Sequence, residues 1–518
     1  MLTEDRKSKG YSQFIYNLNL IKSYIALKLP KNLFGYSSEA LVCRINQQIT
    51  TEGLSGFMSK LDSKGGLSNN SNEKIVFGPF SINLEKKSLI VSYKIYFKSL
   101  VLFMALWVGS FVAFTISFIF SNNFNCKSVL IYGVPLNLRR KNVIKNFESF
   151  CLGETESPFS EKVRYIVQSW RASGHSERII YSKYPILKLL LISKFNFLDF
   201  RFFFREHFLV LLFFLFHSLK SHELSLLWRD FALHSSVRLL NRKKIITAFL
   251  LTNTQWSRQY LWMSDLHGRK FKTFMIPYSM NYSPLKFKKS GIVEYSPHPY
   301  IMQLRVDEIW VWSPEDIKEL KKMNVLAQPY VKKPILWYPD LKLLPIKHSR
   351  FKITIFEVTP FNSETLANRG LNGNYYSCNT IQSFVKDIIE ICSEISEELS
   401  IKIDIEIKQK RSFSKYHDQN YINFINRIVD EKRLMVIDHN ENLFSIIRAS
   451  DLIISIPFSS PAYIARAIGK YAIFYDPTDL ILNDTIKNAG INFYSDKFKL
   501  KSHMIKLIKS FYKPTKNL

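Results

Sequence analysis

Cysteine is scarce in this sequence, and its spacing is not that of a disulfide-bonded or zinc-binding protein. The five cysteines of the 518 residues stand singly, with no C-x-x-C pair. An odd number of cysteines in so long a chain argues against a disulfide framework and predicts a reducing compartment. No histidine and cysteine cluster has metal-ligand spacing, so we expect no metal site and no cofactor.

Acidic residues are also few. The 43 Asp and Glu residues stand against 72 Lys and Arg residues, which gives a formal net charge of +29. Such an excess predicts an anionic partner: nucleic acid, a phospholipid surface, or phosphorylated small molecules such as nucleotide sugars or lipid diphosphates. Charge alone does not choose among these partners. Because no nucleic-acid-binding module is recognisable, we expect no nucleic acid.

The N-terminal region, residues 1–98, is weakly patterned and starts with a polar segment that lacks the apolar core of a cleaved export signal. The uncharged apolar run at residues 100–120 is long enough to cross a bilayer as a helix. We therefore expect a transmembrane or membrane-anchor helix over 99–121; the alternative is a buried core helix. Basic residues flank both ends, so charge does not set the orientation. A second run, 208–216, is interpreted as too short to span and as a core or interfacial element.

From Ser128 onward, short β-rich runs alternate with helical stretches, which is typical of an α/β fold with parallel strands. Between them we predict helices, one of them over 161–173. Prolines interrupt the segment 327–349, which predicts a connection between two lobes. The sequence thus predicts an N-terminal Rossmann-like lobe over 126–330, a linker over 331–349 and a C-terminal Rossmann-like lobe over 350–518. The expected strands lie at 128–135, 177–184, 245–252, 272–279 and 307–313, then at 351–360, 401–408, 434–440, 451–457 and 470–477.

The segment 449–477 is the most informative part of the chain. An apolar strand is followed by Ser459 and Ser460, and Pro461 stands at a first helical position. A helix that starts at a strand end presents free backbone N–H groups and its positive dipole end, which together bind anions. A nucleotide-sugar phosphate is the expected ligand. The alternative is that Ser459 only caps its helix.

This segment, with its Pro-Phe-Ser-Ser turn, Gly-Lys pair and Tyr-Asp-Pro ending, resembles the donor-binding half of GT-B glycosyltransferases from bacterial capsule and O-antigen biosynthesis. The stretch IFEVTPFN at 355–362 extends the resemblance. The resemblance implies metal-independent transfer of a sugar from a nucleotide-sugar donor in the C-terminal lobe. The implied acceptor is lipid-linked or a polysaccharide, and the implied base lies in the N-terminal lobe.

A narrower similarity connects the chain to bacterial sialyltransferases, which hold a CMP group with a His-Pro and a Ser-Ser pair. The corresponding pairs here are His298-Pro299 and Ser459-Ser460. In those enzymes both pairs lie in the C-terminal lobe, whereas His298 precedes the proline-rich connection.

Two groups of candidate site residues follow. The candidate bases are titratable residues of the first lobe, and the donor-binding candidates stand at strand ends of the second lobe, where ligands of doubly wound sheets gather. For each residue the alternative is a turn cap or a solvated surface position. The bases are His298, Glu294, Asp265 and His267; the donor-binding candidates are Thr359, Ser459, Ser460, Pro461, His439, Glu441 and Asp476.

Because nucleotide sugars are cytoplasmic, we expect both lobes on the cytoplasmic side of the inner membrane. Two other functions stay open from the sequence. One is a non-catalytic, membrane-associated protein of polysaccharide biosynthesis or export; the other is a nucleic-acid-binding protein.

Overall fold

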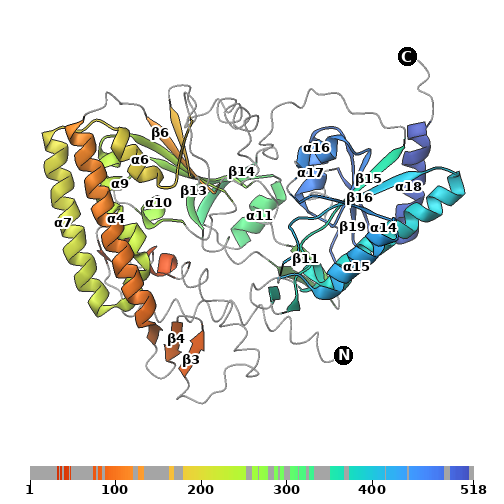
Figure 1. Cartoon of the computed structure of the whole chain (residues 1–518), viewed down its shortest axis with the longest axis horizontal. Helices are drawn as coiled ribbons and strands as arrows, with labels where there is room; N and C mark the ends of the chain where they lie inside the picture. Colours follow the sequence, from red (N-terminus) through yellow and green to blue (C-terminus); the bar gives the residue numbers. More distant parts are fainter. Residues whose placement is uncertain are drawn as a thin grey trace. The chain divides into compact units, whose positions relative to one another are not determined.

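The chain folds into two compact units in the computed structural model (Figure 1). Unit 1 comprises Met1–Pro277, Pro299–Trp310 and Lys322–Tyr330, and unit 2 comprises Tyr278–His298, Val311–Lys321 and Val331–Leu518. Each is described by itself. The structure describes residues 32–33, 36–37, 40–45, 47, 74–77, 80–83, 88–120, 127–133, 163–168, 179–252, 259–265, 268–277, 285–289, 292–296, 301, 304–312, 314–322, 326–331, 350–363, 365–366, 373–414, 416–439, 441, 443–483 and 490–512.

Unit 1 is built around a seven-stranded sheet with the order β14-β13-β10-β9-β6-β7-β8. All pairings from β13 to β8 are parallel. Numbered from β6, the strands of this sheet follow the order 3-2-1-4-5-6 of a dinucleotide-binding fold, with β14 added at the edge. The strands are β6 (Ser128–Tyr132), β7 (Arg164–Gln168), β8 (Ile179–Ser182), β9 (Ile246–Leu251), β10 (Lys272–Met275), β13 (Arg305–Val311) and β14 (Leu326–Val331).

Unit 2 contains a six-stranded sheet with the order β17-β16-β15-β18-β19-β20. Every pairing is parallel, and the order is again 3-2-1-4-5-6. The two sheets confirm the predicted α/β class with two Rossmann-like lobes. The strands are β15 (Phe351–Phe356), β16 (Ile403–Lys408), β17 (Met435–Ile437), β18 (Leu452–Ser455), β19 (Tyr471–Tyr475) and β20 (Asn492–Tyr494). A hairpin of β11 (Leu285–Lys289) and β12 (Ile292–Ser296) also belongs to this unit.

Helices cover both sheets. In unit 1 they are α6 (Pro185–Ile192), η2 (His222–Leu227), α8 (Trp228–Ala232), α9 (His234–Arg242) and α10 (Leu261–Asp265), besides two long helices described below. Among the helices of unit 2 are α11 (Pro314–Lys322), α13 (Gly373–Tyr376), α14 (Cys378–Leu399), α15 (Gln419–Asp430), α16 (Leu443–Arg448), α17 (Ser460–Ala467) and α18 (Lys497–Tyr512).

The helix predicted over 161–173 is wrong, because Arg164–Gln168 forms strand β7. Four of its five residues are buried between β6 and β8. A strand inside a parallel sheet is covered on both faces, so its sequence is a continuous apolar run without alternation. Such a short run has no period that distinguishes a strand from a helix.

The predicted apolar helix is α4 (Tyr93–Ile119), which begins where the Ser92 side chain accepts a hydrogen bond from the Ile95 backbone N–H. The run 208–216 is not the short element that we expected. It belongs to α7 (Phe197–Lys220), which starts at a capping box of Asn196 and Asp199. Both helices are long and apolar enough to cross a membrane by length and composition, so the expectation of one such helix is corrected to two.

Part of the N-terminal region 1–98, which was expected to be weakly patterned, forms regular β-structure. Strands β3 (Lys74–Phe77), β4 (Phe80–Asn83) and β5 (Ser88–Val91) form an antiparallel sheet before α4, and β1 (Asn32–Leu33) pairs with β2 (Tyr36–Ser37).

Candidate functional site

The strand order of unit 2 makes a topological switch point at the carboxyl ends of β15 and β18. These two strands are neighbours, but the chain continues from β15 towards β16 and from β18 towards β19. Connections that leave in opposite directions open the sheet edge, and ligands of such sheets bind there. Phe356 and Ser455 are the last paired residues, so the segments that follow them emerge side by side.

The segment after β18 is a tight turn into α17. Phe458 has φ 62°, a left-handed conformation that is unusual for a residue other than glycine. It turns the chain so that Ser459 becomes the N-cap of α17, with φ −82° and ψ 146°, and Pro461 stands in the first turn. The Ser459 side chain makes no capping hydrogen bond, and its Oγ is buried without a partner.

Other buried polar atoms at this edge also lack partners. Thr359 Oγ1, Ser455 Oγ and one carboxylate oxygen of Glu357 have no hydrogen bond. A buried polar atom without a partner costs on the order of 1–3 kcal/mol. Such atoms persist where a ligand or an ordered water completes them. Four of the buried unpaired atoms among the described residues, from Glu357, Thr359, Ser455 and Ser459, lie beside the Rossmann switch point of unit 2, where ligands of such sheets bind, and this edge is therefore the candidate functional site.

Glu357 is the site residue that sequence reasoning missed. Its Oε2 accepts a hydrogen bond from the Tyr421 hydroxyl of α15, and Oε1 is the unpaired oxygen. Burial raises the pKa of Glu357 to about 8, although the backbone N–H of Lys410 and the ammonium of Lys408 act in the opposite direction. The carboxyl group is therefore mostly neutral at pH 7 and offers a hydrogen-bond donor as well as an acceptor. A glutamate directly after a buried strand was the signal in the sequence.

The remaining donor-binding candidates have different surroundings. His439 follows β17, which β16 separates from β15, and its carbonyl oxygen accepts a 2.7 Å hydrogen bond from Lys408 Nζ. Glu441 is exposed. Asp476 is buried, and it accepts from the Thr478 N–H and hydroxyl with one oxygen and from the Ile481 N–H with the other.

The structure therefore brings Thr359, Ser459, Ser460 and Pro461 to the switch point, whereas His439, Glu441 and Asp476 lie at other strand ends. Both oxygens of the Asp476 carboxylate accept hydrogen bonds from the loop that follows β19.

Two of the four candidate bases, His267 and His298, lie outside the described residues. Asp265 ends α10 of unit 1. Glu294 is on β12, opposite Phe287, and so belongs to unit 2 and not to the first lobe, where the base was expected.

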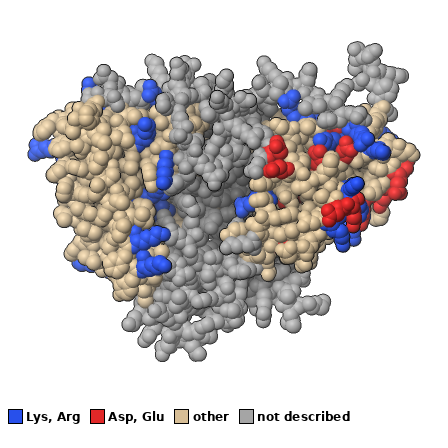
Figure 2. Space-filling model, viewed as in Figure 1, with Lys and Arg blue, Asp and Glu red and all other residues tan. Residues whose placement is uncertain are grey.

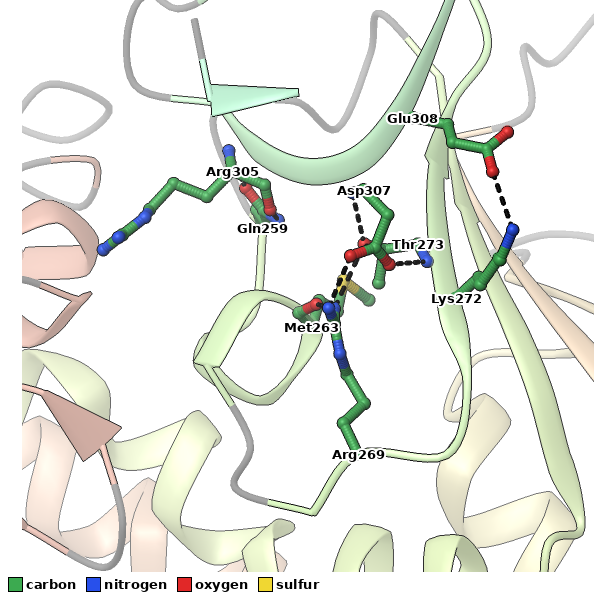
Figure 3. Close-up of polar contacts among 8 residues, drawn as sticks. All are labelled: Gln259, Met263, Arg269, Lys272, Thr273, Arg305, Asp307 and Glu308. Atoms are coloured by element: carbon green, nitrogen blue, oxygen red, sulfur yellow. Dashed lines mark hydrogen bonds and ion pairs between the residues drawn. The ribbon is translucent and has the colours of Figure 1, made fainter. Parts of the chain in front are cut away.

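A polar network fixes the end of α10 (Figure 3). The Arg269 guanidinium donates to the Met263 carbonyl oxygen of α10 and to the Asp307 carboxylate of β13. The other Asp307 oxygen accepts a 2.7 Å bond from the Thr273 N–H of β10. These bonds tie the backbone that carries Asp265 to two strands of the sheet. Within the described residues no three His, Cys, Asp or Glu side chains are grouped to hold a metal ion.

Fold and site together define a two-unit α/β protein with a Rossmann-ordered sheet in each unit and unpaired buried polar groups at the switch point of the second. Residues 210–504 match the sequence model of the family described as polysaccharide biosynthesis PFTS motif protein. That match spans more than half of the chain, so the protein belongs to this family. The chain reads Pro-Phe-Asn-Ser at 360–363 and Pro-Phe-Ser-Ser at 457–460, and each differs at one position from the four letters of the family name.

Several solved structures are similar in part. The wall teichoic acid polymerase TagF is 8% identical with a TM-score of 0.38, over 80% of this chain and 92% of the other. The lipopolysaccharide outer core galactosyltransferase WaaB is 10% identical with a TM-score of 0.36, over 74% and 91%. MnaA of S. aureus, solved with UDP, is 9% identical with a TM-score of 0.36, over 74% and 89%. Superpositions at this level do not define an activity. No curated protein sequence matches the chain significantly.

Proposed function

We propose that this protein is a metal-independent glycosyltransferase of the GT-B type. It moves a sugar from a nucleotide-sugar donor to a lipid-linked or polysaccharide acceptor during assembly of a surface polysaccharide. The observation that carries the proposal is the group of unpaired polar atoms at the switch point of unit 2. Membership of a polysaccharide-biosynthesis family supports the class of reaction.

The donor phosphates bind at the start of α17 in this proposal. The phosphate lies outside the strand ends and accepts hydrogen bonds from the backbone N–H groups at the helix start and from the Ser459 hydroxyl. The hydroxyl of Thr359 completes the site from the β15 side. When the bond between the anomeric carbon and the phosphate oxygen breaks, the leaving nucleoside phosphate takes the electron pair, and fixed N–H dipoles stabilise its charge.

The acceptor binds in unit 1, and a base removes the proton of its attacking hydroxyl as the new glycosidic bond forms. The candidates within that unit are Asp265 and His267, whereas His298, like Glu294, falls in unit 2 by its position in the chain.

The basic surplus and the helices α4 and α7 support attachment to a membrane. Because nucleotide sugars are cytoplasmic, both units then lie on the cytoplasmic side of the inner membrane. We expect residues 128–518 to be protected from protease added to intact spheroplasts. Digestion of this portion there would contradict the location.

The function is tested by incubating membranes that contain the protein with a panel of labelled nucleotide sugars. The wild type transfers label from at least one donor, and Ser459→Ala/Thr359→Val transfers it at least ten-fold more slowly because two hydroxyl contacts are lost, at about 1 kcal/mol each. Ser510→Ala, on the exposed side of α18, is the matched control and keeps the wild-type rate. Equal transfer by both variants contradicts the assigned site.

The two rival functions have their own outcomes. A wild type that transfers no sugar from any donor favours the non-catalytic role in polysaccharide export. Tight binding of oligonucleotides at low salt favours the nucleic-acid-binding role.

A further inference from the structure

Helices α4 and α7 form an antiparallel pair on unit 1, where they run side by side (Figure 1). Ring contacts join the two helices along their length. The residue number of the partner on α7 decreases as the residue number on α4 increases, which is the pattern of an antiparallel pair. The centroids are 4.1 Å apart for Phe103 and Phe214 and 4.2 Å for Phe114 and Phe203. Between these contacts the indole N–H of Trp107 donates a 3.0 Å bond to the carbonyl oxygen of His207.

The inner faces of both helices are fastened to the body of unit 1. The Ser117 hydroxyl of α4 donates to the carbonyl oxygen of Ser193, which follows α6. His207 Nδ1 of α7 lies 2.8 Å from Ser235 Oγ of α9. Near the other end of α4, the Tyr96 ring packs on His222 of η2, with centroids 4.7 Å apart. Contacts to the body therefore run along the pair and are not confined to one end.

Basic side chains of the body of unit 1 form ion pairs with acidic side chains on the inner face of α7. Asp199 is buried and 2.7 Å from Lys243 Nζ, and Glu206 is buried and 2.7 Å from the Arg238 guanidinium. If α4 and α7 crossed a bilayer, α9 with these cations would enter the hydrocarbon region as well. Moving such groups to the centre of a bilayer is strongly unfavourable. The packing thus argues against a spanning arrangement for this pair.

The outer faces of α4 and α7 are largely apolar and exposed. Large hydrophobic side chains recur at intervals of three or four residues along α4 and from Phe204 to Leu219 of α7, so each helix presents an apolar stripe to the outside. On α4 the exposed members are Phe97, Val101, Met104, Val108, Val112, Ile116 and Ile119; on α7 they are Leu198, Phe204, Phe208, Leu209, Leu212, Phe213, Phe216 and Leu219. We call these two stripes the outer face.

The exposed charges of the two helices are all basic. They are Lys94 and Lys98 near the start of α4, Arg201 and Arg205 in the first half of α7, and Lys220 at its end. The two acidic residues of α7 are the buried, paired ones. Figure 2 shows Lys and Arg but no Asp or Glu on the described surface where this pair lies. An apolar face bordered by cations alone is complementary to an anionic lipid surface.

We propose that α4 and α7 lie parallel to the membrane plane, with the outer face inserted into the boundary between headgroups and acyl chains of an anionic bilayer. The basic side chains then contact the lipid phosphates, and α6, α8 and α9 stay on the aqueous side. A helix inserted in this way reaches about 5–10 Å into the bilayer. The proposal does not depend on sugar transfer.

Vesicle binding by the full-length protein tests the surface. Val108→Glu/Leu212→Glu places two charges on the outer face, and we expect binding to phosphatidylglycerol-containing vesicles to weaken at least ten-fold. Met435→Glu/Val436→Glu is the matched control, since these exposed residues lie on β17 of unit 2, and it keeps the wild-type affinity. Equal binding by both variants, with unchanged thermal unfolding, overturns the proposal.

The basic border is tested by Lys98→Gln/Arg201→Gln, because Arg205 already pairs with Glu206 at 3.2 Å. Each such cation near an anionic surface contributes about five-fold to binding, so the variant loses preference for anionic over purely zwitterionic vesicles. Lys509→Gln on α18 is the control for charge and retains the preference. A wild type that binds no vesicles and elutes with twice the mass of the chain assigns the outer face to a second copy and also overturns the proposal.

Orientation is read from the two ends of α4. The single variants Lys94→Cys and Phe120→Cys are each bound to sealed vesicles and then treated with a membrane-impermeant maleimide. Labelling of the unsubstituted protein gives the background from its own cysteines. Both positions react from the side of protein addition if the helix lies in the plane. A spanning helix leaves one position unreactive until detergent is added, which contradicts the proposal.

Discussion

The hydroxyl of Tyr421 donates a hydrogen bond to Glu357 Oε2, and neither side chain has appreciable contact with solvent. The bond joins α15 to the end of β15 across 64 positions of sequence. It fixes a carboxyl group beside the switch point, with one oxygen bonded and the other unpaired.

Tyr421→Phe removes this hydrogen bond, while the backbone N–H of Lys410 remains beside the Glu357 carboxyl group. We expect the free energy of unfolding to fall by about 1 kcal/mol, the net contribution of one hydrogen bond. Urea denaturation at pH 7 measures the change. Tyr471→Phe, whose ring is 61% exposed, is the control and stays within about 0.5 kcal/mol of the wild type. Equal losses in the two variants contradict the assignment.

Glu357→Gln changes how stability depends on pH. The folded pKa of Glu357, about 8, is raised above the ordinary value of 4.5, so the folded state holds a proton that the unfolded state releases between these values. The wild type therefore loses stability as the pH rises from 4.5 to 8. Glutamine does not titrate but still accepts the bond from Tyr421. The melting temperature of Glu357→Gln should exceed that of the wild type by more at pH 8 than at pH 5; an equal difference at both values contradicts the raised pKa.

Much of the fold was predictable because buried parallel strands are short, continuous apolar segments bounded by polar residues. The ten strands expected between Ser128 and Pro477 all occur, and the alternation with helices indicated the parallel arrangement. The exceptions have physical causes. β7 was indistinguishable from a helix because both its faces are buried. The length of α7 was hidden because charged residues interrupt its apolar run, and two of them, Asp199 and Glu206, are neutralised by distant partners.

From the sequence, only the backbone elements of the candidate site were predictable, and not the environment of its side chains. A strand, a hydroxyl pair and a proline identified the start of α17, because those features are local. The environment of Glu357 depends on Tyr421 and on the order of strands in the sheet, neither of which is encoded in neighbouring residues. For the same reason the sequence could not tell that Asp476 uses both carboxylate oxygens within its own loop.

Asp476→Ala should act on stability and not on donor recognition. The substitution leaves the buried N–H group of Ile481 and the part-buried N–H group of Thr478 without their acceptor, so we expect a loss of roughly 1–3 kcal/mol. Thermal unfolding measures this loss, and the KM for the donor, measured below the melting transition, stays within about two-fold of the wild type. A variant with normal stability and a much higher KM returns Asp476 to the donor site.

The buried ion pair of Arg44 and Asp230 anchors the segment 40–45 in unit 1. Arg44 Nε lies 3.3 Å from Asp230 Oδ1, the side chains are 4% and 1% exposed, and the same oxygen accepts from the Leu261 N–H of α10. Arg44→Met leaves a buried carboxylate uncompensated, so we expect about 3–5 kcal/mol of destabilisation. Lys272→Met breaks the pair with Glu308, whose lysine is 65% exposed, and costs at most about 1 kcal/mol.

The double variant Arg44→Met/Asp230→Asn separates charge from packing. Asparagine keeps an oxygen for the Leu261 N–H but carries no charge, so the second substitution should restore stability relative to Arg44→Met alone, although each change made singly destabilises. Denaturant midpoints of the four proteins, wild type included, give the coupling energy between the two side chains. A double variant less stable than Arg44→Met would show that the arginine acts through its packing on Tyr260, 5.8 Å from the ring centroid, and not through the carboxylate.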